Sequence, residues 1–479
     1  MHIQLVLKTL GLVLLFEAAA MVPSLFISIF YQEAGTFSFL VGITAAGLAG
    51  CGLYLVPVKH KNVGYREGFA IATFSWLLLA LFGAIPFAVA GAVPGYIDAV
   101  FETMSGFTTT GASVIPNVEI LPKSILFWRS LTHWLGGMGI IVLTLALIPS
   151  LNIAGMQLFK AEVPGPTKSK VLPRIAQTSR QLYKVYVFIT LIQVAALKLA
   201  GLSWFDSFIH TFGSVATGGF SNYNASVGHF QSLAVETIII FFMVLSGINF
   251  ALHYYWMRGD CRPLWQDYET RLFLTLILCS TAVISVNLFI VTGHSPAQAV
   301  REALFTVCSL ITTTGYATAD YDQWPALSKF ILLFLMFVGG CAGSTGGGLK
   351  VGRLLILTKA FSRQLMRLIH PKAVIPVRIG QDVVAQEVVE SAHVFFTLYM
   401  MLFALGTAVL AALGLDLVSA ASAAAANLGN VGPGLGLVGP MFNYADLPDL
   451  GKMTLTFLML VGRLEIYTVL LVFSVKFWR

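Results

Sequence analysis

Long apolar runs separated by short polar stretches are the dominant pattern of this chain. An apolar run of about 18 or more residues is long enough to cross a membrane as an α-helix. Ten runs qualify, near residues 9–30, 38–57, 69–92, 124–150, 185–202, 233–256, 272–292, 327–349, 391–413 and 453–475. A membrane β-barrel would show strands of about ten alternating residues instead. The pattern therefore predicts an all-α polytopic membrane protein with ten transmembrane helices.

Composition supports this class of protein. Hydrophobic residues make up 57% of the 479 positions and charged residues only 11%, whereas soluble domains have about 25% charged residues. The first apolar run continues past Pro23 without a small-residue cleavage site, which favours a retained helix over a signal peptide.

The placement of charge predicts orientation. Basic residues gather near both ends and in alternate loops, at 59–66, 160–184, 258–271 and 350–378, whereas the other loops carry Asp98, Glu119, Asp320, Asp322, Asp446 and Asp449. Under the positive-inside rule, both termini are cytoplasmic. The net charge of +7 reflects this bias. No aromatic-basic patch indicates nucleic-acid binding.

Four segments between the apolar runs share another pattern, a half-length helix that leads into a glycine turn. They span 96–115, 204–224, 299–321 and 414–436. Each opens with an acidic residue suited to a helix N-terminus, and these residues are Asp98, Asp206, Glu302 and Asp416. Each then reaches a key glycine, and these glycines are Gly111, Gly218, Gly315 and Gly432.

The spacing of these segments predicts four pseudo-equivalent units around one axis, in addition to two leading helices. The predicted units are residues 61–160, 161–260, 261–375 and 376–479, and the two additional transmembrane helices occupy residues 1–60. We therefore expect four re-entrant pore helices with pseudo-fourfold symmetry.

A single threonine-glycine turn is most simply a helix C-cap with a left-handed glycine. Four such turns on one side of a membrane favour another interpretation. Non-helical backbone at membrane depth is tolerated only where it is buried in protein or lines a water-filled path. Converging carbonyl groups can replace the hydration shell of a monovalent cation. The negative C-terminal ends of the half-helices favour a cation at the same place.

On these motifs the sequence resembles the Trk/Ktr/HKT superfamily of cation transporters, and within it the TrkH/TrkG-type potassium uptake subunits. The resemblance covers essentially the whole chain. Its carriers, in order, are FTTTGAS, GGMGIIVL, ATGGFSNYN, TTTGY, GGCAGSTGGGLK, NVGPGLG and GRLEIY.

The resemblance implies a potassium selectivity filter, because a glycine in each of the four turns accompanies potassium selectivity in that family. The implied filter segments are 109–112, 217–220, 313–316 and 430–433. The implied K+-binding residues are Thr109, Thr110, Gly111, Thr217, Gly218, Thr313, Thr314, Gly315, Asn430, Val431 and Gly432. K+ is then the transported ion. Because only the central glycine is common to the four turns, we expect selectivity to be less sharp than in channels with a TVGYG filter.

A glycine-rich stretch, GGCAGSTGGGLK, interrupts the run at 327–349. Glycines weaken a helix by about 1 kcal/mol each relative to alanine. One interpretation is close helix packing through small residues. The resemblance implies an intramembrane gating loop below the filter, made of Gly343, Ser344, Thr345, Gly346, Gly347 and Gly348. The stretch lacks the lysine and hydroxyl spacing of a phosphate-binding loop.

Arg463 is a charge inside the last apolar run, which makes it a functional candidate. One interpretation is an ion pair with Glu465, although residues two apart on a helix point to different sides. The resemblance implies that Arg463 projects into the pore as a barrier to cations, and that Lys350 anchors the end of the loop. The patterns do not decide the roles of Glu17 and Glu102. His133 and His210 are expected to be packing residues.

The predicted function is potassium uptake across a bacterial inner membrane. The alternative is a secondary symporter that couples potassium to protons or sodium. An intramembrane enzyme would need a motif such as GxSxG or HExxH, and the chain contains neither. The resemblance implies a homodimer that is gated by a cytoplasmic TrkA-type nucleotide-binding subunit. The basic cytoplasmic segments suit either docking of that subunit or contact with anionic membrane lipid.

Overall fold

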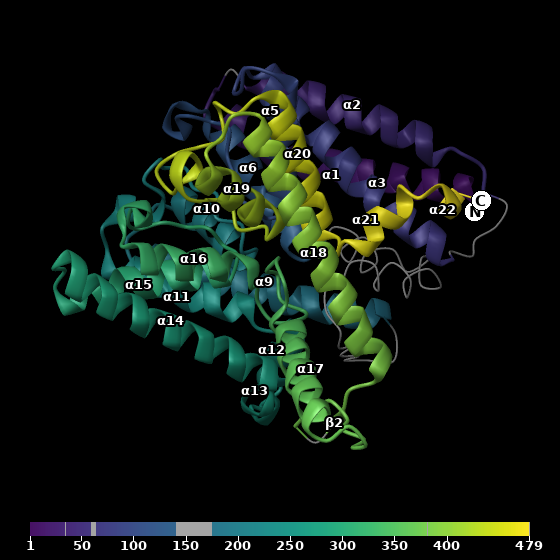
Figure 1. Cartoon of the computed structure of the whole chain (residues 1–479). Coiled ribbons are helices and arrows are strands. Elements are labelled where there is room, and N and C mark those ends of the chain that lie inside the picture. Colours follow the sequence, from purple (N-terminus) through teal and green to yellow (C-terminus); the bar gives the residue numbers. More distant parts are fainter. Residues whose placement is uncertain (34, 59–63, 140–174, 381, 479) are drawn as a thin grey trace.

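The chain folds into a bundle of helices in which long, broken and short helices alternate (Figure 1). The computed structural model describes residues 1–33, 35–58, 64–139, 175–380 and 382–478. The predicted all-α membrane class is confirmed, because six helices in this part of the chain are long and apolar enough to cross a membrane.

The long helices provide most of these spans. They are α1 (Ile3–Phe30), α2 (Thr36–Tyr54), α3 (Tyr65–Gly83) with α4 (Ile85–Val89), α9 (Ile175–Leu199), α14 (Tyr268–Thr292) and α18 (Gln386–Ala412). Helices α1 and α2 pack side by side along one flank, where α1 also contacts α3 (Figure 1).

Four predicted spans begin as helices that end early. These helices are α6 (Lys123–Gly137), α11 (Leu233–Gly247), α16 (Ala326–Phe337) and α20 (Asp449–Arg463). Helix α12 (Phe250–Met257) follows α11 after a bend of 105°, and α21 (Tyr467–Val472) follows α20. The runs at 233–256, 327–349 and 453–475 are therefore not continuous helices. Most of the run at 124–150 beyond α6 lies outside the described residues, so the number ten stays a prediction.

Four short helices are buried between these elements. They are α5 (Tyr96–Phe107), α10 (Trp204–Val215), α15 (Pro296–Ile311) and α19 (Leu417–Leu428). Asp98 and Asp206 lie in the first turns of α5 and α10, and Asp416 caps α19. The prediction for Glu302 is wrong. Because the Ser295 side chain accepts a hydrogen bond from the Gln298 amide, α15 begins six residues earlier.

Two hydrophobic cores hold the bundle together. The larger one joins α1, α3, α5, α6, α18, α19 and α20, and the second joins α11, α14, α15 and α16. The short helices contribute to both, so their positions depend on every long helix around them.

The remaining elements lie mostly at the ends of the bundle. They are α13 (Arg262–Gln266), α17 (Val351–Ile369), the antiparallel strands β1 (Arg378–Ile379) and β2 (Asp382–Val383), α22 (Val475–Trp478) and the 3-10 helices Val118–Ile120, Ser226–Phe230, Tyr321–Gln323 and Gly436–Val438. Helix α17 packs on α18 and protrudes with the two strands at the lower end of Figure 1.

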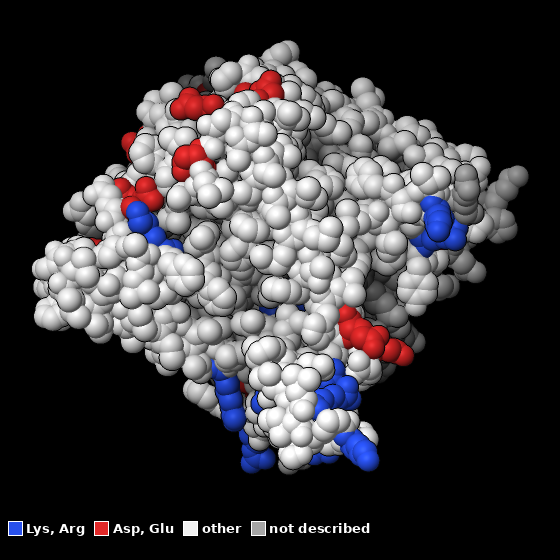
Figure 2. Space-filling model, viewed as in Figure 1, with Lys and Arg blue, Asp and Glu red and all other residues white. Residues whose placement is uncertain are grey.

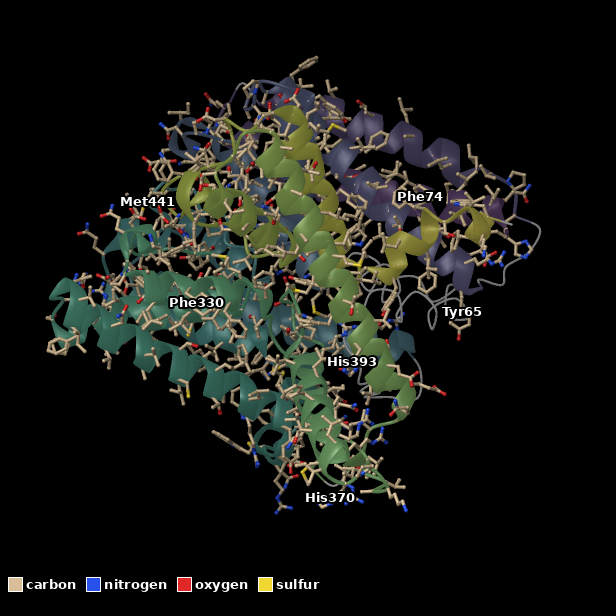
Figure 3. The ribbon with its side chains drawn as sticks, viewed as in Figure 1. Tyr65, Phe74, Phe330, His370, His393 and Met441 are labelled. Atoms are coloured by element: carbon tan, nitrogen blue, oxygen red, sulfur yellow. The ribbon has the colours of Figure 1, made fainter. Side chains whose placement is uncertain are left out.

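Charge is unevenly distributed over the visible face. Lys and Arg gather around the protruding lower end and near the termini, whereas most Asp and Glu lie at the upper left (Figure 2). Figure 3 marks these two ends by one residue each: Met441, beyond the short helix α19, and His370, directly after the basic helix α17, lie far apart. This separation of charge agrees with the asymmetry of the loops in the sequence.

Gly136 allows α6 to approach the end of α5. A Cβ atom at Gly136 would lie less than 3.0 Å from the Phe107 carbonyl oxygen. We expect Gly136→Ala to lower the free energy of unfolding by about 1–3 kcal/mol, the usual effect of overpacking, as measured by thermal unfolding in detergent. Gly47→Ala is the control, since nothing lies within 4 Å of its added Cβ. Equal melting temperatures for the two variants would contradict this close approach.

Candidate functional site

The four short helices end in turns with the same backbone conformation. The second residue after each helix has a positive φ of 55° to 59°, at Thr109, Thr217, Thr313 and Asn430. The next amide donates to a carbonyl oxygen five residues back, over 2.7–2.8 Å, in all four turns. This is the hydrogen bond of a Schellman cap. Threonine is β-branched and rarely adopts a left-handed conformation, so three of the caps are strained as functional sites often are.

A second positive φ follows two residues later in every turn. It falls at Gly111, Gly219, Gly315 and Gly432, with φ of 82°, 80°, 78° and 99°. The sequence assignment of Gly218 as the second key glycine is therefore wrong by one position, because Gly218 aligns with Thr110 and Thr314 instead. In all four turns the two left-handed residues flank one that has no positive φ. This alternation turns successive carbonyl groups toward one side, which a strand of uniform conformation does not do.

The turns contact one another in a closed cycle. A Cβ atom at the second left-handed glycine of each turn would lie less than 3.0 Å from a carbonyl oxygen of the next turn. The pairs are Gly111 with Gly218, Gly219 with Thr314, Gly315 with Val431, and Gly432 with Thr110. These four carbonyl groups come from equivalent positions, so the same contact repeats around the cycle. Glycine is needed because any side chain there would displace a carbonyl group.

Hydroxyl groups brace two of the turns. Thr108 and Thr110 share a hydrogen bond of 2.8 Å, and Thr312 and Thr314 share one of the same length. The fourth turn has Gly429 and Val431 at the equivalent positions, with Asn430 between them. There, the Asn430 side-chain amide donates to Thr110 Oγ1 and to the Met459 carbonyl oxygen, both over 3.0 Å. The fourth turn is thus linked directly to the first.

A mouth of about 130 Å³ opens above the cycle. Gly111, Gly219, Gly315 and Pro433 line it, one from each turn, together with Arg129, Tyr444 and Met441. The mouth touches the later residues of each turn. All four turns therefore contribute to its lining.

The glycine-rich loop lies at the opposite end of the turns. It follows α16, and a bridge between Val338 and Leu349 closes it. The Gly347 amide donates to Thr313 Oγ1 over 2.8 Å, and Thr217 Oγ1 lies 3.2 Å from Thr345 Oγ1. The loop therefore contacts the first left-handed residues of two turns.

Neighbouring elements hold the loop from several sides. The Arg463 guanidinium donates to the Thr345 carbonyl oxygen over 2.7 Å and to the Gly136 and Gly137 carbonyl oxygens over 2.7 and 3.0 Å. Lys350 Nζ is buried and donates to the Gly346 carbonyl oxygen. The structure thus brings both cations predicted from the sequence onto the loop.

The interpretation of Arg463 as the ion-pair partner of Glu465 is wrong. Glu465 lies beyond the end of α20 with a φ of 54°, and its carboxylate pairs with Arg353 over 2.7 Å. The break after Arg463 separates the two side chains, which a continuous helix would also have pointed apart. Arg463 is consequently available to the loop.

Sequence reasoning missed Arg129 and Glu269 and left the role of Glu102 undecided. Arg129 and Glu102 form a buried ion pair beside the mouth, and Glu269 accepts a hydrogen bond from the Ala342 amide over 2.9 Å at the start of the loop. Arg129 lies inside the apolar run at 124–150. The rule that singled out Arg463, a charge at membrane depth, applies equally to Arg129.

Comparisons with known proteins agree on one family. The profile of the TrkH family, described as a cation transport protein, matches residues 37–478. The Trk system potassium uptake protein TrkH of Halomonas elongata is 42% identical over 100% of both chains, and that of Escherichia coli K12 is 38% identical over 100% of both. The crystal structure of the potassium transporter TrkH from Vibrio parahaemolyticus superposes with a TM-score of 0.91 at 36% identity and covers 100% of both chains.

The hydrogen bond between Thr313 and Gly347 can be tested through Cys341, which is buried in the loop. With Cys51, Cys261, Cys279 and Cys308 replaced by serine, we expect Thr313→Val to speed maleimide labelling of Cys341 at least about fivefold, since an unsatisfied buried amide costs about 1–3 kcal/mol. Thr313→Ser retains the hydroxyl group and should label at the original rate. Unchanged labelling of Thr313→Val would contradict a loop held by this bond.

Proposed function

The chain belongs to the TrkH family of cation transport proteins, and we propose that it takes up potassium through the cycle of four turns. Its relatives are transport proteins and not enzymes. In this proposal K+ enters the mouth, exchanges its hydration shell for backbone carbonyl oxygens, and leaves on the cytoplasmic side when the loop moves. The filter comprises residues 109–112, 217–220, 313–316 and 430–433. Gly219, and not Gly218, is then the left-handed glycine of the second turn.

The observation that carries the proposal is the closed cycle of glycine–carbonyl contacts. A large monovalent cation needs several oxygen ligands at one level, because it gives up several waters at once. Equivalent carbonyl groups at Thr110, Gly218, Thr314 and Val431 meet this need. Their uncharged dipoles bind an ion weakly enough for it to leave again.

The four short helices add a favourable field. Each points its C-terminal end at the turns, and a helix C-terminus carries the equivalent of about −0.5 elementary charge. Four such ends around one centre stabilise a cation there without a carboxylate that would hold it tightly. Passive, channel-like conduction is therefore preferred to a symporter, which would need titratable groups in the path.

The loop 343–348 is proposed as the gate. Its contacts with Thr217 and Thr313 close the path directly below the turns. The Arg463 guanidinium adds a positive charge at that level, which opposes the passage of cations. Lys350 ties the end of the loop to Gly346. Opening requires these contacts to break together.

The larger organisation follows from the same proposal. Ten spans and four re-entrant helices would form four units with pseudo-fourfold symmetry at 61–160, 161–260, 261–375 and 376–479, after two additional helices at 1–60. The protein would lie in a bacterial inner membrane with both termini in the cytoplasm. A homodimer regulated by a cytoplasmic TrkA-type nucleotide-binding subunit fits the relatives' membership of a Trk system, and the basic end around α17 suits contact with that subunit or with anionic lipid.

The filter is tested by Gly111→Ser and Gly219→Ser in cells that lack other potassium uptake systems. Left-handed strain at a functional site costs about 1–3 kcal/mol, and each added Cβ conflicts with a carbonyl oxygen of the next turn. We expect growth at limiting potassium to fail and sodium sensitivity to rise. Gly47→Ser is the control, because its added Cβ meets open space. Rescue by Gly219→Ser equal to that by the unchanged protein would refute the filter assignment.

The gate is tested by deletion of residues 344–347 and, separately, by Arg463→Gln. Both should raise basal 86Rb+ flux into proteoliposomes, the second by about fivefold, since removal of one nearby charge is worth about 1 kcal/mol. Lys8→Gln, near the N-terminus, removes one positive charge far from the loop and should leave flux unchanged. Low flux in the deletion variant would reduce the loop to a packing element.

A further inference from the structure

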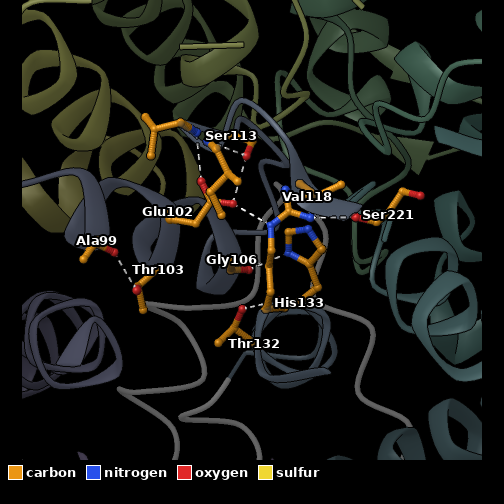
Figure 4. A network of polar contacts seen from close by, with 12 residues as sticks. Ala99, Glu102, Thr103, Gly106, Ser113, Val118, Thr132, His133 and Ser221 are labelled. Atoms are coloured by element: carbon orange, nitrogen blue, oxygen red, sulfur yellow. Dashed lines mark hydrogen bonds and ion pairs between the residues drawn. The ribbon is translucent and has the colours of Figure 1, made fainter. Parts of the chain in front are cut away.

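A buried ion pair lies directly behind the first two turns (Figure 4). Glu102 is in α5 and Arg129 is in α6, and Arg129 Nε donates to Glu102 Oε1 over 2.5 Å. The Glu102 side chain is 0% exposed and the Arg129 side chain 4% exposed. We call this pair the 102–129 clamp.

Glu102 holds the chain that leaves the first turn. Its carboxylate accepts hydrogen bonds from Ser113 Oγ over 3.1 Å and from the Val114 amide over 2.9 Å. Ser113 and Val114 follow Gly111 by two and three residues. The carboxylate therefore fixes the chain immediately after the first turn.

Arg129 holds the equivalent chain of the second turn. Its Nη1 donates to the Ser221 carbonyl oxygen over 2.9 Å, and its guanidinium carbon lies 3.5 Å from the centre of the Phe220 ring. Phe220 and Ser221 follow Gly219 directly. One ion pair thus connects the exits of two adjacent turns.

The contacts continue behind the second turn. The Phe220 ring stacks on His133 with ring centres 4.0 Å apart, and His133 Nδ1 donates to the Gly106 carbonyl oxygen over 2.7 Å. The same imidazole fills the space where a side chain at Gly218 would lie. The second turn is therefore supported from its back as well as at its exit.

The other neighbouring turns are joined without an ion pair between them. Tyr316 Oη donates to the Phe220 carbonyl oxygen over 3.2 Å, between the third and second turns, and the Gly436 amide donates to Asp322 Oδ1 over 3.0 Å, between the chains beyond the fourth and third turns. The exits of the first and second turns, by contrast, are joined through a buried ion pair. Charge-assisted hydrogen bonds are shorter and stronger than neutral ones, so the clamp holds this junction firmly.

We propose that Glu102 and Arg129 are positioning residues that set the separation of the first two turns and thereby the discrimination of K+ against Na+. This inference rests on the proposed function. Na+ is smaller than K+, so carbonyl groups must move closer together to bind it well. The clamp opposes that movement, because it fixes both exits to a common pair of helices. It also keeps the Arg129 charge neutralised beside the mouth.

The decisive variants separate position from charge. Glu102→Gln keeps an acceptor but leaves Arg129 unpaired, whereas Glu102→Gln with Arg129→Met removes both charges and the clamp. Arg129→Lys keeps the charge but loses the planar fork that reaches Glu102 and Ser221 together. Asp98→Asn is the matched control. It breaks another buried ion pair made by α5, Asp98 with Lys452 over 2.6 Å, and Asp98 otherwise accepts a hydrogen bond from the Gly95 amide.

The measurement is the ratio of 86Rb+ to 22Na+ flux into proteoliposomes, with thermal unfolding in detergent recorded for every variant. Breaking a buried pair by removal of one partner is strongly destabilising, so Glu102→Gln and Asp98→Asn should both melt earlier. We expect the flux ratio to fall about tenfold in Glu102→Gln, in Arg129→Lys and in the double variant, a size consistent with transmission of part of that energy, and to stay unchanged in Asp98→Asn.

Three outcomes would overturn the inference. An unchanged flux ratio in Glu102→Gln would remove any role in selection. An equal fall in Asp98→Asn would reduce the effect to general loss of stability. A ratio restored in the double variant would assign the effect to the charge of Arg129 and not to the position of the turns. If the unchanged protein carries no 86Rb+, the proposed function fails and not the clamp.

Discussion

Four stretches of backbone depart from helical geometry in the interior of a membrane protein, and the rest of the structure depends on how their polar groups are satisfied. Each turn returns an amide to the end of its own short helix. The half-length helices are therefore needed as acceptors as well as a source of favourable field. The left-handed glycines follow from the same constraint, because the cycle closes only where no Cβ intervenes.

The breaks in the surrounding helices belong to the same arrangement. Small residues let α6 and α20 approach the ends of α5 and α19 closely, as Gly136 does against Phe107 and Gly462 against Leu428. Helices α6, α11, α16 and α20 all end near this level. Their freed carbonyl groups then serve as acceptors, two of them for Arg463 and one, from Gly247, for the Cys341 amide of the loop. The backbone carbonyl groups at the helix ends and the amide groups of the loop therefore satisfy each other's hydrogen-bonding capacity away from water.

The sequence predicted the class of fold, the four turns and the loop, because apolar length and glycine placement act locally. It could not predict which of Gly218 and Gly219 is left-handed, since that depends on which carbonyl group the neighbouring turn presents. The start of α15 was misplaced because Ser295 competes with Glu302 as an N-terminal signal. The partners of Arg463 and Glu465 lie more than a hundred residues away, and hydrophobic periodicity carries no information about such pairs.

The attachment of the loop has a consequence for the response of the protein to any regulator. The loop is tied to α11 through Ser246 and Gly247, to α20 through Arg463, and to two turns through Thr217 and Thr313. Because these bonds all hold one short segment, we expect them to break together. A partly released loop is then less stable than either the fully attached or the fully released loop. For the gate proposed above, this predicts two positions of the loop and no stable intermediate. A regulator that strained any one attachment would then shift the whole population steeply, because the free energies of all the attachments enter a single equilibrium.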